Sequence, residues 1–488
     1  MATVGVEEQQ LLIGGSWVSA EAGRTFERAD PFTGEAVTVA AAAGRADARR
    51  AVEAAHAAFP AWAATPPARR RELLNAAADL LAERAQEIAA TVTEETGGTF
   101  GWGMFNVMLA GNMLRAAAGQ AYSGTGELIP SDVPGATSTA VRQPVGVVVG
   151  IAPWNAPVIL GTRAVATPLA YGNTVVLKAS EQCPRVHAHI VRALADAGLP
   201  DGVINLLTND PADAADVVEE LIAHPLARRI NFTGSSAVGR IIAEKSATHF
   251  KRTLLELGGK APFVVLDDAD LEEAANAASF GAFMHSGQIC MSTERIIADS
   301  SVVDDFSAKL AERASKLVVG DPRDQSTQIG PVIGEGARDR IMGLIEDARS
   351  KGATVLAGGE ADGLLIQPTV LGGVTPEMRI YREESFGPVV AIITVDGVEQ
   401  AVEVANDSDY GLSGAVFGAD THRAREVAGL LETGICHVNS STVQDEPQMP
   451  FGGVKHSGWG RFGGSAALDE FTELRWISIQ DGSRHYPI

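Results

Sequence analysis

The most constraining feature of this sequence is the regular alternation of short apolar runs with longer helix-like stretches between residues 145 and 259. The runs are rich in β-favouring residues and have the length of strands, and 186–197 is typical of the stretches between them. The expected strands lie at 145–151, 174–177, 203–207, 229–232 and 253–257. Such alternation specifies a parallel sheet with right-handed crossovers, covered by helices on both faces.

A second alternating series follows the first. It predicts strands at 263–266, 295–298, 389–394 and 415–417, and helices at 302–317, 337–351 and 421–431. The 488 residues also exceed one ordinary core, because a domain takes about 150 residues. The sequence therefore predicts an α/β protein with two such domains.

Three further segments lie outside both series. Residues 45–95 are Ala-rich with helical spacing that is interrupted at Pro66 and Pro67, which predicts a helical hairpin. Segments 127–141 and 471–480 carry β-favouring side chains in an imperfect alternation. Isolated strands are unstable alone, so we expect these two to pair with each other and with a neighbouring subunit.

The charge balance excludes several classes of partner. There are 61 Asp and Glu residues against 39 Lys and Arg residues, a formal net charge of −22. This charge repels polyanions and argues against nucleic acid or an anionic membrane surface as partner. Residues 1–10 have no basic region before an apolar stretch, and no run approaches about 18 apolar residues, so we expect a cytoplasmic protein.

Cysteine and histidine patterns argue against a metal site. Cys183, Cys290 and Cys436 are too scattered for a disulfide framework or a zinc motif, and no HExxH is present. A lone cysteine is usually a packed core residue. Cys290 follows Gly287, which permits close backbone approach, and as a nucleophile it would need a base, an oxyanion donor and an electron acceptor nearby.

Two candidate phosphate turns can be compared. The fingerprint GxGxxG occurs at Gly458, Gly460 and Gly463, but it follows a polar stretch and not a strand, so we reject it. The turn that begins at Gly234 and Ser235 directly follows the expected strand 229–232 and opens a helix, whose N-terminus can bind phosphate. The same turn could equally be a simple helix cap.

Glu181 lies just beyond the expected strand 174–177 and Lys178. A carboxylate at the end of a parallel strand can accept hydrogen bonds from a ribose diol. A single glutamate in a loop is more often simply solvated. Position alone does not decide between the two.

Several of these segments together resemble the aldehyde dehydrogenase superfamily, from about Leu11 to the C-terminus. The motifs occur in the family's order: Pro153-Trp154-Asn155, Lys178 to Glu181, Phe232-Thr233-Gly234-Ser235, Leu255-Glu256-Leu257-Gly258-Gly259-Lys260, Gly287-Gln288-Ile289-Cys290, Glu383-Glu384-Ser385-Phe386-Gly387-Pro388 and Pro450-Phe451-Gly452-Gly453. One such motif would be weak, whereas the ordered set is specific.

The resemblance implies a Rossmann-type cofactor domain, a second α/β catalytic domain and a β-arm for oligomerisation. On this interpretation residues 1–123 and 145–256 bind NAD, and residues 257–455 form the catalytic domain. Residues 124–144 and 456–488 would form the arm and the C-terminal tail. The expected assembly is a homodimer or a homotetramer.

Catalytic roles also follow from the resemblance. Cys290 matches the nucleophile that attacks the aldehyde carbon, and its reference pKa of about 8.5 means that the site must supply a base or lower that pKa. The side-chain amide of Asn155 and the backbone N–H of Cys290 match the oxyanion hole. Hydride leaves to the nicotinamide, and Glu256 then activates the water that hydrolyses the thioester.

The cofactor implied is NAD. The matching positions are Lys178 and Glu181 for the adenine ribose, Trp154, Gly234 and Ser235 for the phosphates, and Glu384 and Phe386 for the nicotinamide ribose and ring. NAD is expected over NADP because the Glu181 carboxylate would repel a 2′-phosphate, although Lys178 could partly neutralise it. Ser385 departs from the family, which commonly has an aliphatic residue there.

The short motifs look most like those of salicylaldehyde, vanillin and benzaldehyde dehydrogenases, which implies an aromatic aldehyde as substrate. Ala156 stands where many members carry a bulky aromatic residue, and so leaves room beside Asn155. Phe451, Met108 and Met113 are candidate apolar walls, with ordinary core positions as the alternative. Arg163 could equally meet a ring oxygen or form a surface ion pair.

Three alternatives remain. The first is an aliphatic aldehyde or semialdehyde dehydrogenase with the same mechanism. The second is a CoA-acylating enzyme, which would not require a water-activating glutamate, so that Glu256 counts against it. The third is a homologue that keeps the fold without turnover.

Overall fold

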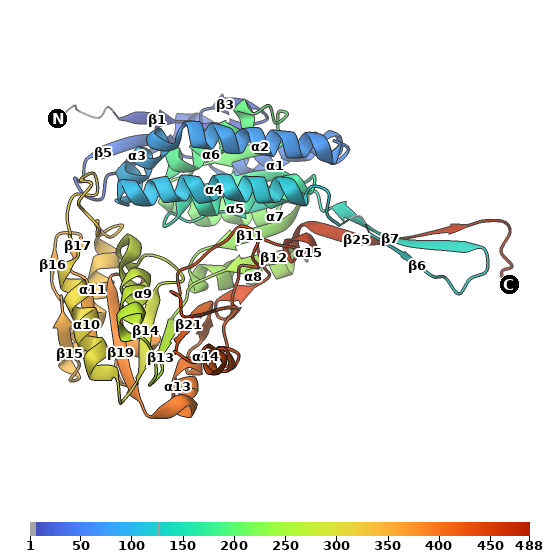
Figure 1. Ribbon diagram of the computed structural model, residues 1–488. Coiled ribbons are helices and arrows are strands. Elements are labelled where there is room, and N and C mark those ends of the chain that lie inside the picture. Colours follow the sequence, from blue (N-terminus) through green and yellow to red (C-terminus); the bar gives the residue numbers. More distant parts are fainter. Residues whose placement is uncertain (1–5, 125) are drawn as a thin grey trace.

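The body of the molecule is built on two large sheets covered by helices, and a narrow arm projects from it (Figure 1). The computed structural model describes residues 6–124 and 126–488. The predictions made for residues 1–5 lie outside these ranges. Within them, no helix is long and apolar enough to cross a membrane.

The first sheet has eight strands in the order β24-β12-β11-β8-β9-β10-β2-β3. Its strands are β2 (Leu11–Ile13), β3 (Ser16–Val18), β8 (Val147–Ile151), β9 (Thr174–Lys178), β10 (Ile204–Leu207), β11 (Ala227–Thr233), β12 (Arg252–Glu256) and β24 (Gly458–Trp459). The five predicted strands are all present and mutually parallel. The antiparallel edges β2, β3 and β24 were not predicted, and β24 comes from the segment that the resemblance assigned to the arm and tail.

Helices cover both faces of this sheet, as predicted. They are α1 (Arg45–Ala63), α2 (Pro67–Glu83), α3 (Ala85–Thr96), α4 (Phe100–Gln120), α5 (Pro157–Ala170), α6 (Pro184–Asp196), α7 (Ala214–Ala223) and α8 (Ser236–Thr248). Alternate residues of β8 show the two layers, because Val148 packs in the core with α2 and α4 while Val147 and Val149 pack in the core with α1 and α7. The central strand β8, which is covered on both faces, is therefore apolar throughout.

The predicted helical hairpin over 45–95 is wrong in one respect. Pro67 begins α2, as expected of a proline in the first turn. The chain then leaves helical geometry at Arg84, where φ is −95° and ψ is 12°, and α3 begins at Ala85. The segment forms three helices because this break interrupts an otherwise continuous helical pattern.

The second sheet has seven strands in the order β15-β18-β19-β14-β13-β21-β22. They are β13 (Ala261–Val265), β14 (Thr293–Asp299), β15 (Thr354–Ala357), β18 (Thr369–Gly372), β19 (Val389–Val395), β21 (Ser413–Phe417) and β22 (Ile435–Val438). The helices are α9 (Leu271–Phe283), α10 (Val303–Lys316), α11 (Glu335–Ser350), α12 (Arg379–Arg382), α13 (Gly397–Asn406) and α14 (Thr421–Ala428). The four predicted strands form the centre, whereas β15, β18 and β22 were missed.

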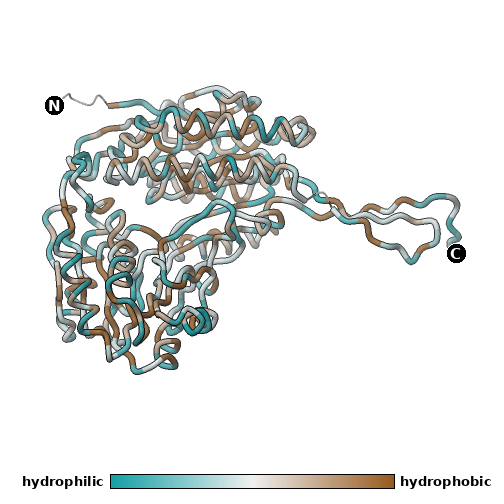
Figure 2. The backbone as a smooth tube through the Cα atoms, in the orientation of Figure 1, coloured by the Kyte–Doolittle hydropathy of each residue, from teal (hydrophilic) through white to brown (hydrophobic). Residues whose placement is uncertain are grey.

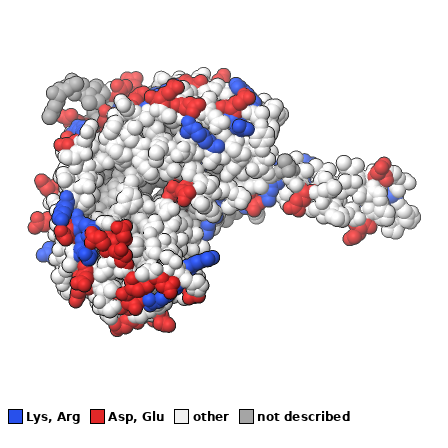
Figure 3. Space-filling view, in the orientation of Figure 1, with Lys and Arg blue, Asp and Glu red and all other residues white. Residues whose placement is uncertain are grey.

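The arm is a three-stranded antiparallel sheet in the order β25-β7-β6, and it extends far from the body (Figure 1). Its elements are β6 (Glu127–Ile129), β7 (Ala136–Pro144) and β25 (Thr472–Gln480), with α15 (Ala467–Phe471) at its base. This confirms that segments 127–141 and 471–480 pair with each other. Apolar residues recur along it, and few charged side chains occupy the middle of its visible face (Figures 2 and 3).

Smaller elements complete the described chain. They are β1 (Glu7–Gln9), β4 (Thr25–Ala29) and β5 (Ala36–Ala41) in one sheet, the ladders β16 (Ala361–Asp362) with β17 (Leu365–Ile366) and β20 (Tyr410–Gly411) with β23 (Val454–Lys455), and the short 3-10 turns η1 (Glu21–Gly23), η2 (Pro211–Asp213) and η3 (Met284–Gly287). The two large sheets are linked directly, because residues 257–260 join the end of β12 to the start of β13. The carboxyl ends of the first sheet's parallel strands therefore lie close to the second unit, where a ligand site is expected in an open α/β sheet.

Candidate active site

A cavity of about 470 Å³ lies at this junction. Its lining residues come from strand ends and loops of both units: Pro153, Trp154, Asn155, Thr233, Gly234, Ser235, Glu256, Leu257, Gly258, Cys290, Arg340, Glu383, Glu384, Phe386 and Tyr410. All three predicted catalytic residues are therefore in one cavity, together with five of the predicted cofactor residues. We call it the cofactor-side cavity.

A second, narrower cavity of about 70 Å³ adjoins the same cysteine. By the same measure one water needs about 10–15 Å³, so this space holds more than a single water. Its lining is mainly apolar and aromatic: Trp102, Phe105, Leu109, Asn155, Ala156, Ile159, Leu160, Arg163, Phe280, Met284, Ile289, Cys290, Met291, Val443, Gln444, Asp445 and Phe451. Cys290 and Asn155 line both cavities, so they stand where the two meet. We call the smaller of the two the substrate-side cavity.

A tight turn places Cys290. His285, Ser286 and Gly287 follow one another in the left-handed region, with φ of 50°, 55° and 69°. A Cβ at Gly287 would lie 2.1 Å from the carbonyl oxygen of Gly387, so only glycine fits there, as the sequence predicted. Ser286 Oγ donates to the carbonyl of Gly330 at 2.8 Å, which anchors the turn before Cys290.

The thiol of Cys290 is held in its protonated form. Burial raises the pKa of Cys290 well above its ordinary value, and the neighbouring Glu256 carboxylate raises this pKa further. Only a thiolate is strongly nucleophilic, so these surroundings disfavour reaction of Cys290. A positive charge brought into the cofactor-side cavity would lower this pKa.

Glu256 ends β12 and its side chain is fully buried. Burial raises the pKa of Glu256 to about 7, although the charge of Arg163 opposes this shift. Among the described residues, neither of its carboxylate oxygens has a hydrogen-bond partner. A buried carboxylate without donors is costly, and one that titrates near neutral pH is suited to act as a general base.

Asn155 follows β8 and is fixed from two sides. Its side-chain Nδ2 donates to the carbonyl of Gln288 at 2.9 Å, and its own carbonyl accepts from Trp102 Nε1 at 3.0 Å. An asparagine amide carries two N–H donors, so one remains for an oxygen at Cys290. This arrangement suits an oxyanion donor next to the nucleophile.

The turn at Gly234 and Ser235 lies at the N-terminus of α8. Ser235 Oγ accepts from the backbone N–H of Val238 at 3.3 Å, so the helix cap considered from the sequence is present. Both residues also line the cofactor-side cavity, which turns the helix N-terminus towards it. The cap and a phosphate site are compatible, because several N–H groups of the first turn remain available.

Glu384 and Phe386 approach the same cavity from the second unit. Glu384 Oε1 accepts from the backbone N–H of Gly259 at 2.8 Å. Burial raises the pKa of Glu384 to about 7, and the charge of Glu294 adds to this rise. The ring of Phe386 meets Trp154 edge to face, with ring centroids 5.9 Å apart.

Lys178 and Glu181 are close to each other but do not line the cofactor-side cavity. They form an ion pair, and Glu181 Oε1 also accepts from Asn209 Nδ2 at 3.0 Å. Lys178 is the last residue of β9, Glu181 lies three residues further along the chain, and Asn209 follows β10, so all three lie at the carboxyl edge of the sheet. Glu181 is therefore neither a free loop carboxylate nor part of the cavity wall.

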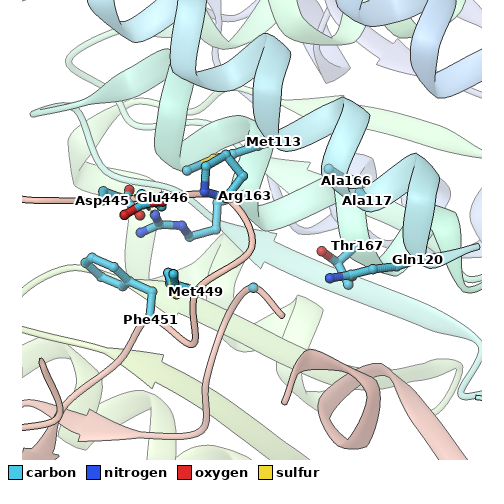
Figure 4. A pocket seen from close by; sticks show the side chains of 12 residues that line it. Met113, Ala117, Gln120, Arg163, Ala166, Thr167, Asp445, Glu446, Met449 and Phe451 are labelled. Carbon is cyan, nitrogen blue, oxygen red and sulfur yellow. Dashed lines mark hydrogen bonds and ion pairs between the residues drawn. The ribbon is translucent and has the colours of Figure 1, made fainter. Parts of the chain in front are cut away.

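Arg163 lines the substrate-side cavity, so its contact with a ring oxygen stays a prediction, whereas the alternative of a surface ion pair is wrong. Its guanidinium pairs with Asp445, and the two side chains are only 6% and 10% exposed, so the ion pair is buried and not at the surface (Figure 4). The guanidinium also stacks on the ring of Phe451, 4.1 Å from its centroid. The partner could not be foreseen, because Asp445 lies 282 residues further along the chain.

The apolar walls were predicted only in part. Ala156 and Phe451 line the substrate-side cavity as expected. Met108 does not, because its side chain is 58% exposed. Met113 lines a small neighbouring pocket beside Arg163 (Figure 4).

The sequence missed the aromatic wall that α4 supplies. Trp102 and Phe105 face the substrate-side cavity and stack on each other, with centroids 5.7 Å apart. Their only sequence signal was the aromatic pair in a helical segment, which ordinary core packing would also give. In the described ranges, no group of three or more His, Cys, Asp or Glu side chains is placed to hold a metal ion.

A family model described as the aldehyde dehydrogenase family matches residues 17–477. The chain is 57% identical over 478 residues to a vanillin dehydrogenase of Pseudomonas fluorescens, covering 98% of this chain and 99% of that protein. It is 40% identical over 474 residues to a benzaldehyde dehydrogenase [NAD(+)] of Pseudomonas putida, covering 97% and 96% of the two.

Solved structures of aldehyde dehydrogenases also match this chain. The crystal structure of a salicylaldehyde dehydrogenase from Pseudomonas putida G7, complexed with salicylaldehyde, superposes with a TM-score of 0.97 at 45% identity and covers 99% of this chain and 100% of that one. A betaine aldehyde dehydrogenase from Staphylococcus aureus in complex with NAD+ gives a TM-score of 0.95 at 33% identity, with 98% and 96% covered.

Proposed function

The chain belongs to the aldehyde dehydrogenase family, and on that premise we propose that it oxidises an aromatic aldehyde to the carboxylic acid with NAD, through a thioester on Cys290. The observation that carries the proposal is that Cys290 and Asn155 line both cavities. One cavity offers a helix N-terminus and a buried carboxylate to a dinucleotide. The other offers aromatic walls to the aldehyde.

The residues of the cofactor-side cavity fit a dinucleotide. The N-terminus of α8 at Ser235 would hold the phosphates, and Glu384 and Phe386 would hold the nicotinamide ribose and ring. A Cβ at Gly258 would lie 2.6 Å from Glu384 Oε2, so the backbone there leaves this carboxylate room. When bound, NAD supplies a cationic ring that favours the thiolate and accepts hydride.

The chemistry at Cys290 has two stages. The thiolate attacks the aldehyde carbon, and Asn155 Nδ2 with the Cys290 backbone N–H stabilises the oxyanion, each such donor contributing about 3 kcal/mol. Loss of hydride leaves the thioester. Glu256, with its pKa raised to about 7 by burial, then takes a proton from the water that attacks the thioester carbon.

The substrate class follows from the substrate-side cavity. Ala156 leaves space beside Asn155, and the aromatic walls offer large apolar contact to a ring. Arg163 is already paired with Asp445, so it does not present a net charge to an anionic semialdehyde. This favours a neutral aromatic aldehyde over succinic semialdehyde, and the named relatives act on vanillin, benzaldehyde and salicylaldehyde.

NAD preference and assembly complete the proposal. Glu181 would accept hydrogen bonds from the adenine ribose diol, and its charge would disfavour a 2′-phosphate although its ion pair with Lys178 weakens the repulsion. The arm exposes Leu128, Trp476 and Ile479, by 74%, 76% and 64%. Apolar strands so exposed are expected to pair with a second subunit, in a homodimer or homotetramer.

A substrate panel tests the function. NADH absorbance is followed with benzaldehyde, salicylaldehyde, vanillin, acetaldehyde, hexanal and succinic semialdehyde, with and without CoA. We expect an aromatic aldehyde to give the highest kcat/KM, without need of CoA. A lead of about tenfold for acetaldehyde or succinic semialdehyde, roughly 1.4 kcal/mol, would reject the aromatic class. Turnover that requires CoA would reject hydrolysis, and absence of turnover would reject the enzyme.

A further inference from the structure

Glu294 makes an unusual set of contacts for a residue outside both cavities. It lies in β14 and its residue exposure is 3%. Its Oε1 accepts from the backbone N–H of Ser385 at 2.9 Å, from Ser385 Oγ at 2.8 Å and from the backbone N–H of Phe386 at 3.0 Å. One buried carboxylate thus accepts hydrogen bonds from three donors of Ser385 and Phe386.

The charge of Glu294 is compensated by Lys260, whose Nζ lies 2.6 Å from Oε2 of Glu294. Burial lowers the pKa of Lys260, and the carboxylate opposes that shift. Removing two charges from water is costly unless the geometry is good and the remaining lone pairs are bonded. Both conditions are met here.

The turn that Glu294 holds is strained and functional. Phe386 has φ of 45°, a left-handed conformation that a residue with a bulky side chain rarely adopts without support. On one side of Ser385 stands Glu384, which Gly259 ties down at 2.8 Å, and on the other stands the Phe386 ring. Gly259 and Lys260 are neighbours, so the turn is held by adjacent residues, directly through Gly259 and indirectly through the Lys260–Glu294 pair.

We propose that Glu294, paired with Lys260, is a positioning residue that sets Glu384 and Phe386 in the geometry that holds the nicotinamide half of the dinucleotide. Ser385 takes part in the same arrangement, because its hydroxyl donates one of the hydrogen bonds to Glu294. The departure of Ser385 from the usual aliphatic residue is thereby explained. The inference rests on the proposed function, since it assumes that these two side chains bind the cofactor.

Glu294→Gln is the central test. The glutamine amide keeps one acceptor oxygen but lacks the negative charge that pairs with Lys260. Its NH₂ group would face a hydrogen-bond donor where the carboxylate presents an acceptor. We expect the Kd for NADH and the KM for NAD to rise about tenfold or more, while the KM for the aldehyde stays within about twofold. NADH binding is measured by fluorescence, independently of turnover.

The chain offers a matched control in Glu95. It is also fully buried, and it accepts from Thr38 Oγ1 at 2.8 Å and from the backbone N–H groups of Arg185 and Val186 at 3.1 Å each. Glu95→Gln therefore changes a similar buried carboxylate in α3, whereas Glu384 belongs to the second unit. We expect it to lower Tm without changing NADH affinity by more than about twofold.

Ser385→Ala provides a second, milder test that does not strand a charge. The substitution removes the hydrogen bond from the Ser385 hydroxyl to Glu294, so we expect NADH affinity to fall about threefold. Ser385→Thr keeps a hydroxyl group and should retain most of the wild-type affinity. Unchanged NADH affinity in either Glu294→Gln or Ser385→Ala would overturn the proposal. Equal losses in Glu294→Gln and Glu95→Gln would also overturn it. Failure of the wild-type protein to oxidise any aldehyde would instead reject the proposed function, since NADH binding is scored separately.

Discussion

Replacing Glu256 by glutamine should separate the two chemical stages at Cys290. The amide keeps the shape of the side chain but cannot take a proton from water, and a positioned general base contributes about 10²- to 10⁴-fold. The negative charge of Glu256 is also one cause of the raised pKa of Cys290, so its removal makes the thiolate easier to form. We therefore expect acylation to survive and steady-state turnover to fall at least about 100-fold.

The assay is stopped-flow NADH absorbance with an aromatic aldehyde in excess. The glutamine variant should release about one NADH per active site in a burst and then almost stop. In the wild-type protein, hydrolysis-limited turnover should rise with pH, because the base works when ionised and the pKa of Glu256 is about 7. The ionised fraction grows about tenfold between about pH 6 and pH 8, and turnover should follow it.

Glu384→Gln is the matched control, because Glu384 is a second carboxyl group of the same cavity whose pKa is raised to about 7. It should weaken NAD binding without producing a burst. The reasoning is refuted if Glu256→Gln shows no burst, which would place Glu256 before hydride transfer. Turnover within about tenfold of wild type, or a flat pH profile, would refute it as well.

Four further outcomes follow from the site and the arm. Cys290→Ala should reduce aldehyde oxidation about 10³-fold or more while NADH binding stays within about twofold, and appreciable turnover would exclude the thioester. Glu181→Gln should raise the ratio of kcat/KM for NADP to kcat/KM for NAD by up to about tenfold, which corresponds to roughly 1.4 kcal/mol. An unchanged ratio would show that Glu181 does not contact the adenine ribose. Ala156→Phe should lower kcat/KM for benzaldehyde about 100-fold but that for acetaldehyde less than tenfold; equal losses would contradict the assigned wall. The double variant Trp476→Glu and Ile479→Glu should reduce the mass seen by light scattering, and an unchanged mass would place the interface elsewhere.

The sequence predicted the parts of the fold that depend on local pattern. The parallel strands β8, β9, β10, β11 and β12 are short, mostly buried runs rich in aliphatic residues, and such runs are visible without any partner. Edge strands such as β15 and β24 are short, and their pairing depends on what the rest of the chain places beside them.

The candidate site also has parts that the sequence predicts and parts that it does not. Cys290, Glu256 and Asn155 stand in ordered motifs, and the structure gathers them in one cavity. The partners of Arg163 and Glu294 are invisible in sequence, since Asp445 and Ser385 lie 282 and 91 residues away from them. Contacts over such separations are set by tertiary packing alone.

Glu256, Glu294 and Glu384 show how packing can suit one residue type to different tasks. Glu294 accepts from one hydroxyl and two backbone N–H groups and faces Lys260, so its oxygens are fully used and it can only hold its neighbours in place. Glu384 accepts one backbone N–H, which fixes it yet leaves acceptor capacity for a ribose hydroxyl. Neither oxygen of Glu256 makes a full hydrogen bond among the described residues, although Cys290 and Thr233 lie close enough to oppose the rise in its pKa, and this suits its proposed role of taking a proton from water. The number of donors around each carboxylate, which no local motif encodes, therefore separates the positioning, binding and catalytic roles.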